Sequence, residues 1–224
     1  MTILLEVDTP AGTGRWHLDL APEPRQVLLL GHGSGRGVEA ADLAACARLL
    51  PARGITVGRF EQPWKAAGRR VAGPPEQLDA AWTAGVLHLL ASHQALDLSG
   101  PGELPVVLGG RSAGARVACR TASALSAERV VCLSFPLHPP GRPEATRVEE
   151  LLSAGVPVHV LQGDDDPYGS GDEIETAVGQ RALHPIAVER VKHAAHSLDV
   201  ADRVRPPEEH EHLLAELVLA GLGE

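Results

Sequence analysis

Apolar residues follow two kinds of spacing along the chain, and the two kinds alternate. At 2–7 and 15–20 they recur at every second position around a turn at 10–14, which predicts an antiparallel hairpin at a sheet edge. Short apolar runs predict further strands at 26–30, 55–60, 105–109, 130–135, 156–162 and 186–191. Apolar positions three or four residues apart predict helices at 43–50, from Pro74 onward, and at 113–125, 148–154, 173–178 and 207–219. A polar loop is expected at 61–73.

The alternation of strands with helices predicts an α/β fold. Strands joined through helices pair in parallel by right-handed crossovers, and both faces of their sheet must be covered. We therefore expect a mostly parallel twisted sheet with helices on both faces. The strand 130–135 is followed by the proline-rich stretch 136–143 rather than by a helical insertion, so no lid domain is expected. The absence of repeats and linkers favours a single domain over residues 1–224.

The composition narrows the classes of function. The chain holds 29 Asp and Glu against 20 Lys and Arg, so neither nucleic acid nor an anionic membrane is an expected partner. It has no apolar stretch long enough to span a bilayer and no recognisable leader, and we expect a cytoplasmic protein. The three cysteines, Cys46, Cys119 and Cys132, fall in apolar patterns, which favours buried free thiols.

Residues 110–114 read Gly-Arg-Ser-Ala-Gly, directly after an apolar run that begins at Val106. A G-x-S-x-G pattern between a strand and a helix is typical of a nucleophile elbow, in which a strained turn exposes the serine hydroxyl. Glycines flank the serine because Cβ atoms would clash in so tight a turn. Ser112 is therefore the candidate nucleophile and the N–H of Ala113 a candidate oxyanion donor. The pentapeptide alone is only moderately specific, and a plain turn is the other interpretation.

Ligands of a parallel sheet bind at the carboxyl ends of its strands. Two such ends carry candidate partners of the serine: Asp164, Asp165 and Asp166 after the strand 156–162, and His193 and His196 after the strand 186–191. In a triad the histidine takes the serine proton and the aspartate orients the imidazole. We favour Asp166 and His196 for these roles. Spacing alone does not decide between them and their neighbours.

A glycine-rich loop, Gly-His-Gly-Ser-Gly at 31–35, follows the strand 26–30. We expect the backbone N–H of Ser34 in this loop to be the second oxyanion donor. A phosphate-binding loop is the alternative, but the lysine and hydroxyl pair of a P-loop is missing. The loop therefore favours stabilisation of an oxyanion over binding of a nucleotide.

Two patterns resemble metal sites but are incomplete. Asp164, Asp166, Gly169 and Glu175 match positions 1, 3, 6 and 12 of a calcium loop, yet Tyr168 stands at position 5 and a β-type run precedes the segment. The pairs His193/His196 and His210/His212 lack the further ligands of a zinc site, and we expect the second pair on the solvated face of the last helix. Neither a metal nor a cofactor is expected.

With these residues in place, the chain resembles the small α/β-hydrolases related to dienelactone hydrolase, in the group that includes testis-expressed protein 30. The resemblance covers nearly the whole chain and rests on ordered segments: GHGSGRG at 31–37, FEQPWKAAGRR at 60–70, GGRSAGAR at 109–116, FPLHPPGRPE at 135–144, and GDDDPYG at 163–169 with the later His196-Ser197 pair. It implies Ser112 as nucleophile, Asp166 as acid and His196 as base, with the loops of Phe60 and Phe135 beside the pocket. Where the group often has Thr-Arg and phenylalanine, this chain has Asp164-Asp165 and Tyr168, which alters the charge at the pocket rim.

The resemblance and the motifs together predict a serine hydrolase that cleaves a small ester, lactone or thioester through an acyl-enzyme. The absence of a lid suits a small-molecule substrate. The candidate substrate-binding residues, chosen by loop position, are His32, Trp64, Arg111, His138 and Tyr168. The arginines near the rim are Arg69, Arg70, Arg111 and Arg142. They suit an anionic substrate, but we favour the interpretation in which Arg111 and Arg142 hold loops.

A second hypothesis belongs to a different class of function: a catalytically idle hydrolase fold that acts as a binding module. The full set of Ser112, Asp166 and His196 with two oxyanion loops speaks against it, because an idle site does not need them all. A homodimer, formed through the edge hairpin or the last helix, is compatible with the sequence.

Overall fold

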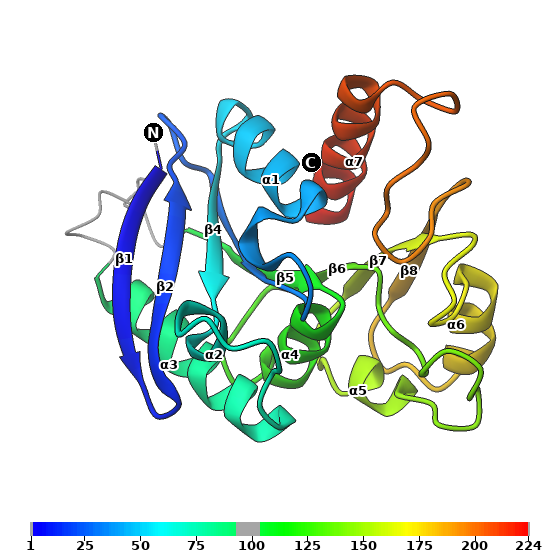
Figure 1. The fold of residues 1–224 in the computed structure, drawn as a ribbon, viewed down its shortest axis with the longest axis horizontal. Coiled ribbons are helices and arrows are strands. Elements are labelled where there is room, and N and C mark those ends of the chain that lie inside the picture. The colour runs from blue at the N-terminus through cyan, green and yellow to red at the C-terminus, as the bar shows by residue number, and fades with distance from the viewer. Residues whose placement is uncertain (1, 93–103, 224) are drawn as a thin grey trace.

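The computed structural model describes residues 2–92 and 104–223, and its centre is an eight-stranded sheet (Figure 1). The strands are β1 (Thr2–Thr9), β2 (Gly12–Asp19), β3 (Gln26–Gly31), β4 (Ile55–Glu61), β5 (Val106–Arg111), β6 (Arg129–Leu133), β7 (Val158–Gly163) and β8 (Ile186–Val191). The helices are α1 (Ala41–Leu49), α2 (Pro63–Ala66), α3 (Pro75–Ala91), α4 (Ala113–Thr121), α5 (Val148–Leu152), α6 (Gly171–Val178) and α7 (Pro207–Leu222), with short 3₁₀ helices η1 (Gly37–Glu39) and η2 (Pro51–Arg53). The predicted order of strands and helices is confirmed.

The strands follow the order β1-β2-β4-β3-β5-β6-β7-β8. β1 and β2 form the predicted antiparallel hairpin at one edge, β2 pairs antiparallel with β4, and the remaining neighbours pair in parallel. The prediction of an α/β fold with a mostly parallel sheet is therefore confirmed. β3 is flanked by β4 on one side and β5 on the other, so the strand order reverses there. Ligands of such sheets bind at this reversal, outside the carboxyl ends of the strands.

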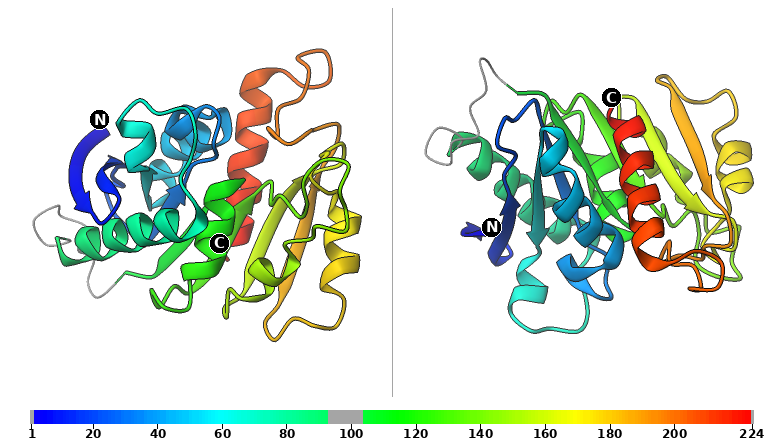
Figure 2. Two further views of the ribbon diagram at one scale, coloured as in Figure 1. Left: turned by 60° about the horizontal axis from the view of Figure 1, so that its bottom comes forward. Right: turned by 90° about the horizontal axis from the view of Figure 1, so that it is seen from above.

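Helices cover both faces of the sheet, as predicted (Figure 2). On one face, α3, α4, α5 and α6 pack on a buried cluster that includes Trp16, Phe60 and Trp82. On the other face, α1 and α7 pack on a second cluster. Within β3, Leu29 belongs to the first cluster while Leu28 and Leu30 belong to the second. A strand that is buried on both faces needs apolar residues at every position, which explains the continuous apolar run of β3.

Some element bounds differ from the prediction. The expected polar loop at 61–73 contains α2, which begins at Pro63, because proline at the first helical position loses no hydrogen bond. α4 ends at Thr121, earlier than predicted. α7 continues to Leu222, where Gly223 adopts a left-handed conformation (φ 86°) that ends the helix.

The cysteines are buried free thiols, as predicted. The Sγ atoms of Cys119 and Cys132 are 3.6 Å apart, well beyond the roughly 2.05 Å of a disulfide. Burial raises the pKa of the Cys46 thiol to about 12, so it carries no reactive thiolate near neutral pH. Across the described residues, no helix combines the length and the apolar character needed to cross a membrane.

Candidate active site

Ser112 lies in a strained turn between β5 and α4. Its backbone has φ 54° and ψ −111°, a left-handed conformation that is costly for a residue with a side chain. The turn is tight because it passes close to β3: a Cβ atom on Gly114 would lie 2.2 Å from the carbonyl oxygen of Gly31. The glycine at this position is therefore a steric requirement, as the elbow pattern predicts. The turn leaves the serine side chain at the carboxyl edge of the sheet.

The structure brings Ser112, His196 and Asp166 into one hydrogen-bonded row. Nε2 of His196 lies 2.8 Å from Oγ of Ser112, and Nδ1 lies 2.8 Å from Oδ2 of Asp166. A carboxylate can only accept, so the proton of the neutral imidazole belongs on Nδ1, and Nε2 accepts from the serine hydroxyl. The imidazole is thus held in the tautomer that can remove the serine proton.

The other candidates lie outside this row. Asp164 and Asp165 are exposed, and so is His193. The Asp166 side chain is instead fully buried and accepts two further hydrogen bonds, from Nε2 of Gln162 and from the N–H of Tyr168, each at 2.8 Å. These donors fix the orientation of the carboxylate that faces the imidazole.

The glycine-rich loop after β3 is held by a buried histidine. Nε2 of His32 accepts from the N–H of Gln62 at 3.0 Å, and Nδ1–H donates to the carbonyl oxygen of Gly33 at 2.7 Å. Burial lowers the pKa of His32, which keeps the ring neutral as these two contacts require. Among residues 2–92 and 104–223, the backbone N–H groups of Ser34 and Ala113 have no hydrogen-bond acceptor. Both N–H groups therefore keep the candidate role given to them from the sequence.

A sequence model of the alpha/beta hydrolase domain matches residues 24–220. The chain belongs to this family. Solved structures share its fold, among them a serine hydrolase without a lid from Xanthomonas campestris (TM-score 0.70, 20% identity, 98% of this chain and 94% of that one covered). A dienelactone hydrolase from Anabaena variabilis has a TM-score of 0.73 at 15% identity, with 99% and 98% covered. An esterase domain from Rhodothermus marinus has a TM-score of 0.68 at 14% identity, with 97% and 96% covered.

In this α/β-hydrolase domain, Arg111 contacts the segment that carries His196. Its Nε donates to Oδ2 of Asp42 at 2.8 Å, and an Nη donates to the carbonyl oxygen of His196 at 2.9 Å. Only 12% of the Arg111 side chain and 2% of the Asp42 side chain are exposed. Arg111 thus links α1 to the loop after β8, the structural role favoured from the sequence. Arg69, Arg70 and Arg142 are exposed.

Of the remaining residues predicted from the sequence, Tyr168 contacts the row, while Trp64 and His138 contact other parts of the chain. The Tyr168 ring lies against His196, with ring centroids 4.2 Å apart and the planes at 31°. Trp64 packs beside the glycine-rich loop after β3, with its ring 5.6 Å from the His32 ring, centroid to centroid. His138 contacts the carbonyl oxygen of Pro139 and, at 3.4 Å, a carboxylate oxygen of Glu173, so it connects the 136–143 stretch to α6.

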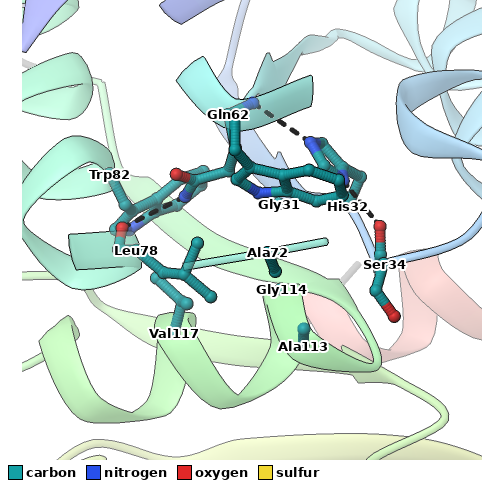
Figure 3. Close-up of a pocket in the computed structure, with 12 residues that line it drawn as sticks. Gly31, His32, Ser34, Gln62, Ala72, Leu78, Trp82, Ala113, Gly114 and Val117 are labelled. Atoms are coloured by element: carbon teal, nitrogen blue, oxygen red, sulfur yellow. Dashed lines mark hydrogen bonds between the residues drawn. The ribbon is translucent and has the colours of Figure 1, made fainter. Parts of the chain in front are cut away.

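A cavity is lined by residues of the loop 31–35 and of the start of α4, Ser34 and Ala113 among them (Figure 3). Its volume is about 10 Å³, close to the space that a single water molecule needs. Ser34 and Ala113 lie at one side of the view in Figure 3, and Leu78 and Trp82 at the other. The full lining is Gly31, His32, Gly33, Ser34, Gln62, Trp64, Ala72, Leu78, Trp82, Ala113, Gly114 and Val117.

The prediction that His210 lies on the solvated face of the last helix is wrong. His210 is buried; its Nε2 lies 2.5 Å from the carbonyl oxygen of Leu198, and its Nδ1 lies 3.1 Å from an Nη of Arg205. The start of α7 packs against the segment that follows His196, which periodicity within one helix does not reveal. His212 is exposed, as expected. Among the described residues, no three His, Cys, Asp or Glu side chains are grouped to hold a metal ion.

Sequence reasoning missed several residues that build the site. Gln162 is the last residue of β7 with a side chain. A polar residue at the end of an apolar run was the signal that could have identified it. Gln62 stands directly after β4 in the same way. Asp42 had no such signal, because its partner Arg111 lies 69 positions away in the sequence. Only the packing of α1 beside the elbow brings these two charges together.

The Asp42 carboxyl makes folding stability depend on pH. Burial raises its pKa from 3.8 to about 6, although Arg111 opposes the shift. Between about pH 4 and 6 the folded chain therefore binds more protons than the unfolded chain, and this contribution to the free energy of unfolding falls as pH rises. Two pKa units correspond to about 3 kcal/mol.

We expect urea unfolding of the wild type and of Asp42→Asn, measured from pH 4 to pH 7, to give free energies whose difference changes by about 3 kcal/mol. The wild type should lose stability relative to the variant as pH rises from about 4 to about 6, with little further change above that. Parallel pH profiles for the two proteins would contradict the raised pKa of Asp42.

Proposed function

We propose that the chain is a serine hydrolase that cleaves a small carboxylic ester, lactone or thioester through an acyl-enzyme. The observation that carries the proposal is the unbroken hydrogen-bonded row from Ser112 Oγ through His196 to the buried Asp166 carboxylate. Nucleophile, base and orienting acid at such distances are the signature of an activated serine. A fold alone does not establish activity, but this row has no other evident use.

In the proposed first step, Ser112 Oγ attacks the carbonyl carbon of the substrate while Nε2 of His196 takes the hydroxyl proton. The carbonyl oxygen becomes an oxyanion, which the N–H groups of Ser34 and Ala113 stabilise. When the intermediate collapses, His196 returns the proton to the leaving oxygen or sulfur, and the acyl group remains on Ser112. Water then attacks the acyl-enzyme with His196 as base, and the acid product leaves with Ser112 restored.

The surroundings of the row support a small substrate. The described residues between β6 and α5 contain no helix that could act as a lid, so the site lies open at the sheet edge. We further propose that the chain belongs to the dienelactone-hydrolase-like group that includes testis-expressed protein 30, on the strength of the segments at 31–37, 60–70 and 163–169.

The test of the proposal is labelling by a fluorophosphonate probe, which reacts with activated serines. We expect the wild type to be labelled stoichiometrically at Ser112, and the Ser112→Ala variant and heat-denatured wild type to remain unlabelled. A peptide map of the labelled protein identifies the modified residue. Absence of label on folded wild type would instead favour a binding module and overturn the proposal.

A further inference from the structure

His196 lies on a long loop that holds it only at a distance. In the part of the chain that the structure describes, no helix or strand lies between β8 and α7. Two points of this loop are tied to other segments. The carbonyl oxygen of Ala194 accepts from the N–H of Asp165 at 3.0 Å, and that of Leu198 accepts from Nε2 of His210 at 2.5 Å. His196 lies between these two points, so its place beside the serine needs a contact of its own.

Arg111 supplies that contact. Among the described residues, the one hydrogen bond of the His196 main chain is the bond from an Nη of Arg111 to its carbonyl oxygen, at 2.9 Å. Arg111 directly precedes Ser112, so two consecutive residues provide the nucleophile and hold the base. The guanidinium also passes close to the glycine-rich loop after β3, because a Cβ atom on Gly33 would lie 3.6 Å from Nη1 of Arg111. Arg111 thus lies where the serine, the base and the glycine-rich loop meet.

The guanidinium is itself fixed by Asp42. Nε of Arg111 donates to Oδ2 of Asp42 at 2.8 Å, and Oδ1 accepts from the N–H of Leu43 at 2.9 Å. Asp42 lies in the first turn of α1, where the helix dipole favours a negative charge. Burial raises its pKa to about 6, so the carboxyl is ionised at pH 8. The positive charge of Arg111 is then balanced in a place where an unpaired charge would be costly.

The two bonds of Arg111 require an arginine. A guanidinium presents its Nε–H and Nη–H groups in one rigid plane, so binding Nε to Asp42 also sets the direction of the Nη that reaches His196. A lysine ammonium is a single charge on a flexible chain and does not fix two partners in this way. We propose that Arg111, anchored by Asp42, is a positioning residue that holds His196 in register with Ser112, an inference that rests on the proposed function.

The test is the rate constant of fluorophosphonate labelling, together with kcat/KM for an uncharged activated acetate ester. Both reagents are uncharged, so neither depends on Arg111 for binding. A shift of about 1 Å in a reacting group can cost about a hundredfold in rate, and for Arg111→Met we expect both constants to fall by about 10- to 100-fold. All measurements are made at pH 8 and well below the melting temperature of each variant. The folded fraction then stays near one, and a lower rate constant reports the site rather than the stability.

Two further variants separate geometry from charge. Arg111→Lys keeps a positive charge beside Asp42 but does not make both bonds, and we expect it to lose nearly as much as Arg111→Met. The double variant Arg111→Met/Asp42→Asn leaves no charge unpaired in the interior, which protects the fold. It should be about as slow as Arg111→Met alone, because Asp42 acts through Arg111 and the two losses are not additive.

The matched control is the ion pair of Arg120 and Asp79, which joins α4 to α3. Nε and an Nη of Arg120 donate to the Asp79 carboxylate at 2.8 and 2.6 Å, and neither side chain contacts the row. Arg120→Met and Asp79→Asn remove partners of a half-buried ion pair in the same way. Both variants should keep the wild-type labelling rate constant.

NMR of ¹⁵N-labelled histidine gives a readout that stability alone does not change. In the wild type, Nδ1–H of His196 is bonded to Oδ2 of Asp166 at 2.8 Å and should give a signal that exchanges slowly with water. In Arg111→Met the loop is released at His196, and this signal should broaden or disappear. In Arg120→Met it should remain.

The outcomes separate this inference from the proposed function. Wild-type labelling and an unchanged Nδ1–H signal in Arg111→Met would overturn the positioning role and leave the serine hydrolase intact. Wild-type rates in Arg111→Lys would show that the charge suffices without the two bonds, and an equal loss in Arg120→Met would show that the effect is general. Either result would also overturn it. Absence of label on folded wild type would reject the proposed function, and this inference with it.

Discussion

Replacing Ser112 by alanine should lower kcat for a short-chain ester by about a million-fold, the loss seen when the nucleophile of a catalytic triad is removed. The reason is the geometry of the row: without Oγ no acyl-enzyme forms, and His196 has no proton to take from it. The fold should persist, because the strain of the elbow lies in the backbone (φ 54°) and alanine has the same Cβ. The measurement is hydrolysis of an activated short-chain ester, with the thermal melting temperature as the check on folding.

Three further variants show whether the loss of activity is specific to the Ser112–His196 pair. His196→Ala and the double variant Ser112→Ala/His196→Ala should each lose about as much as Ser112→Ala alone, because residues that act as a unit are not additive. Ser153→Ala, an exposed serine at the end of α5 whose hydroxyl donates to the carbonyl oxygen of Glu150 at 2.8 Å, should keep wild-type turnover. If Ser112→Ala retains more than about a hundredth of the wild-type rate, a covalent mechanism at this serine is wrong.

The order of elements in this hydrolase domain could be predicted because each signal was local. β3 is apolar from Val27 to Leu30 because the strand is buried on both faces, whereas the antiparallel hairpin alternates apolar with polar residues. The elbow was equally local, because the G-x-S-x-G pattern that predicts it spans the five consecutive residues 110–114. Where the signal for an element lies within a few consecutive residues, the element can be predicted from the sequence.

The parts that could not be predicted depend on contacts between distant segments. Three aspartates follow β7 in succession, and only the turn that buries Asp166 under Gln162 and Tyr168 distinguishes it from its neighbours. His210 is 12 positions from Leu198 and becomes buried only when α7 returns to the sheet. The partner of a side chain is set by the path of the backbone in three dimensions, which residue spacing does not encode.

Asp166→Asn should lower kcat by about ten-thousand-fold while the chain keeps its fold, by analogy with the same change in a serine protease triad. The surroundings of Asp166 give the physical reason. Oδ1 faces the N–H of Tyr168, and Oδ2 faces both Nε2 of Gln162 and Nδ1 of His196. If the asparagine oxygen keeps the Tyr168 contact, its NH₂ group points at His196, and the imidazole must then carry its proton on Nε2.

An imidazole with its proton on Nε2 cannot accept the proton of Ser112, so the serine loses its base. NMR of ¹⁵N-labelled His196 should accordingly report a change of tautomer from Nδ1–H to Nε2–H. The neighbouring change Asp165→Asn is the matched control, because Asp165 is exposed and outside the row, and it should retain nearly full activity. A loss of less than about tenfold in Asp166→Asn, or an unchanged tautomer, would show that Asp166 does not orient this histidine.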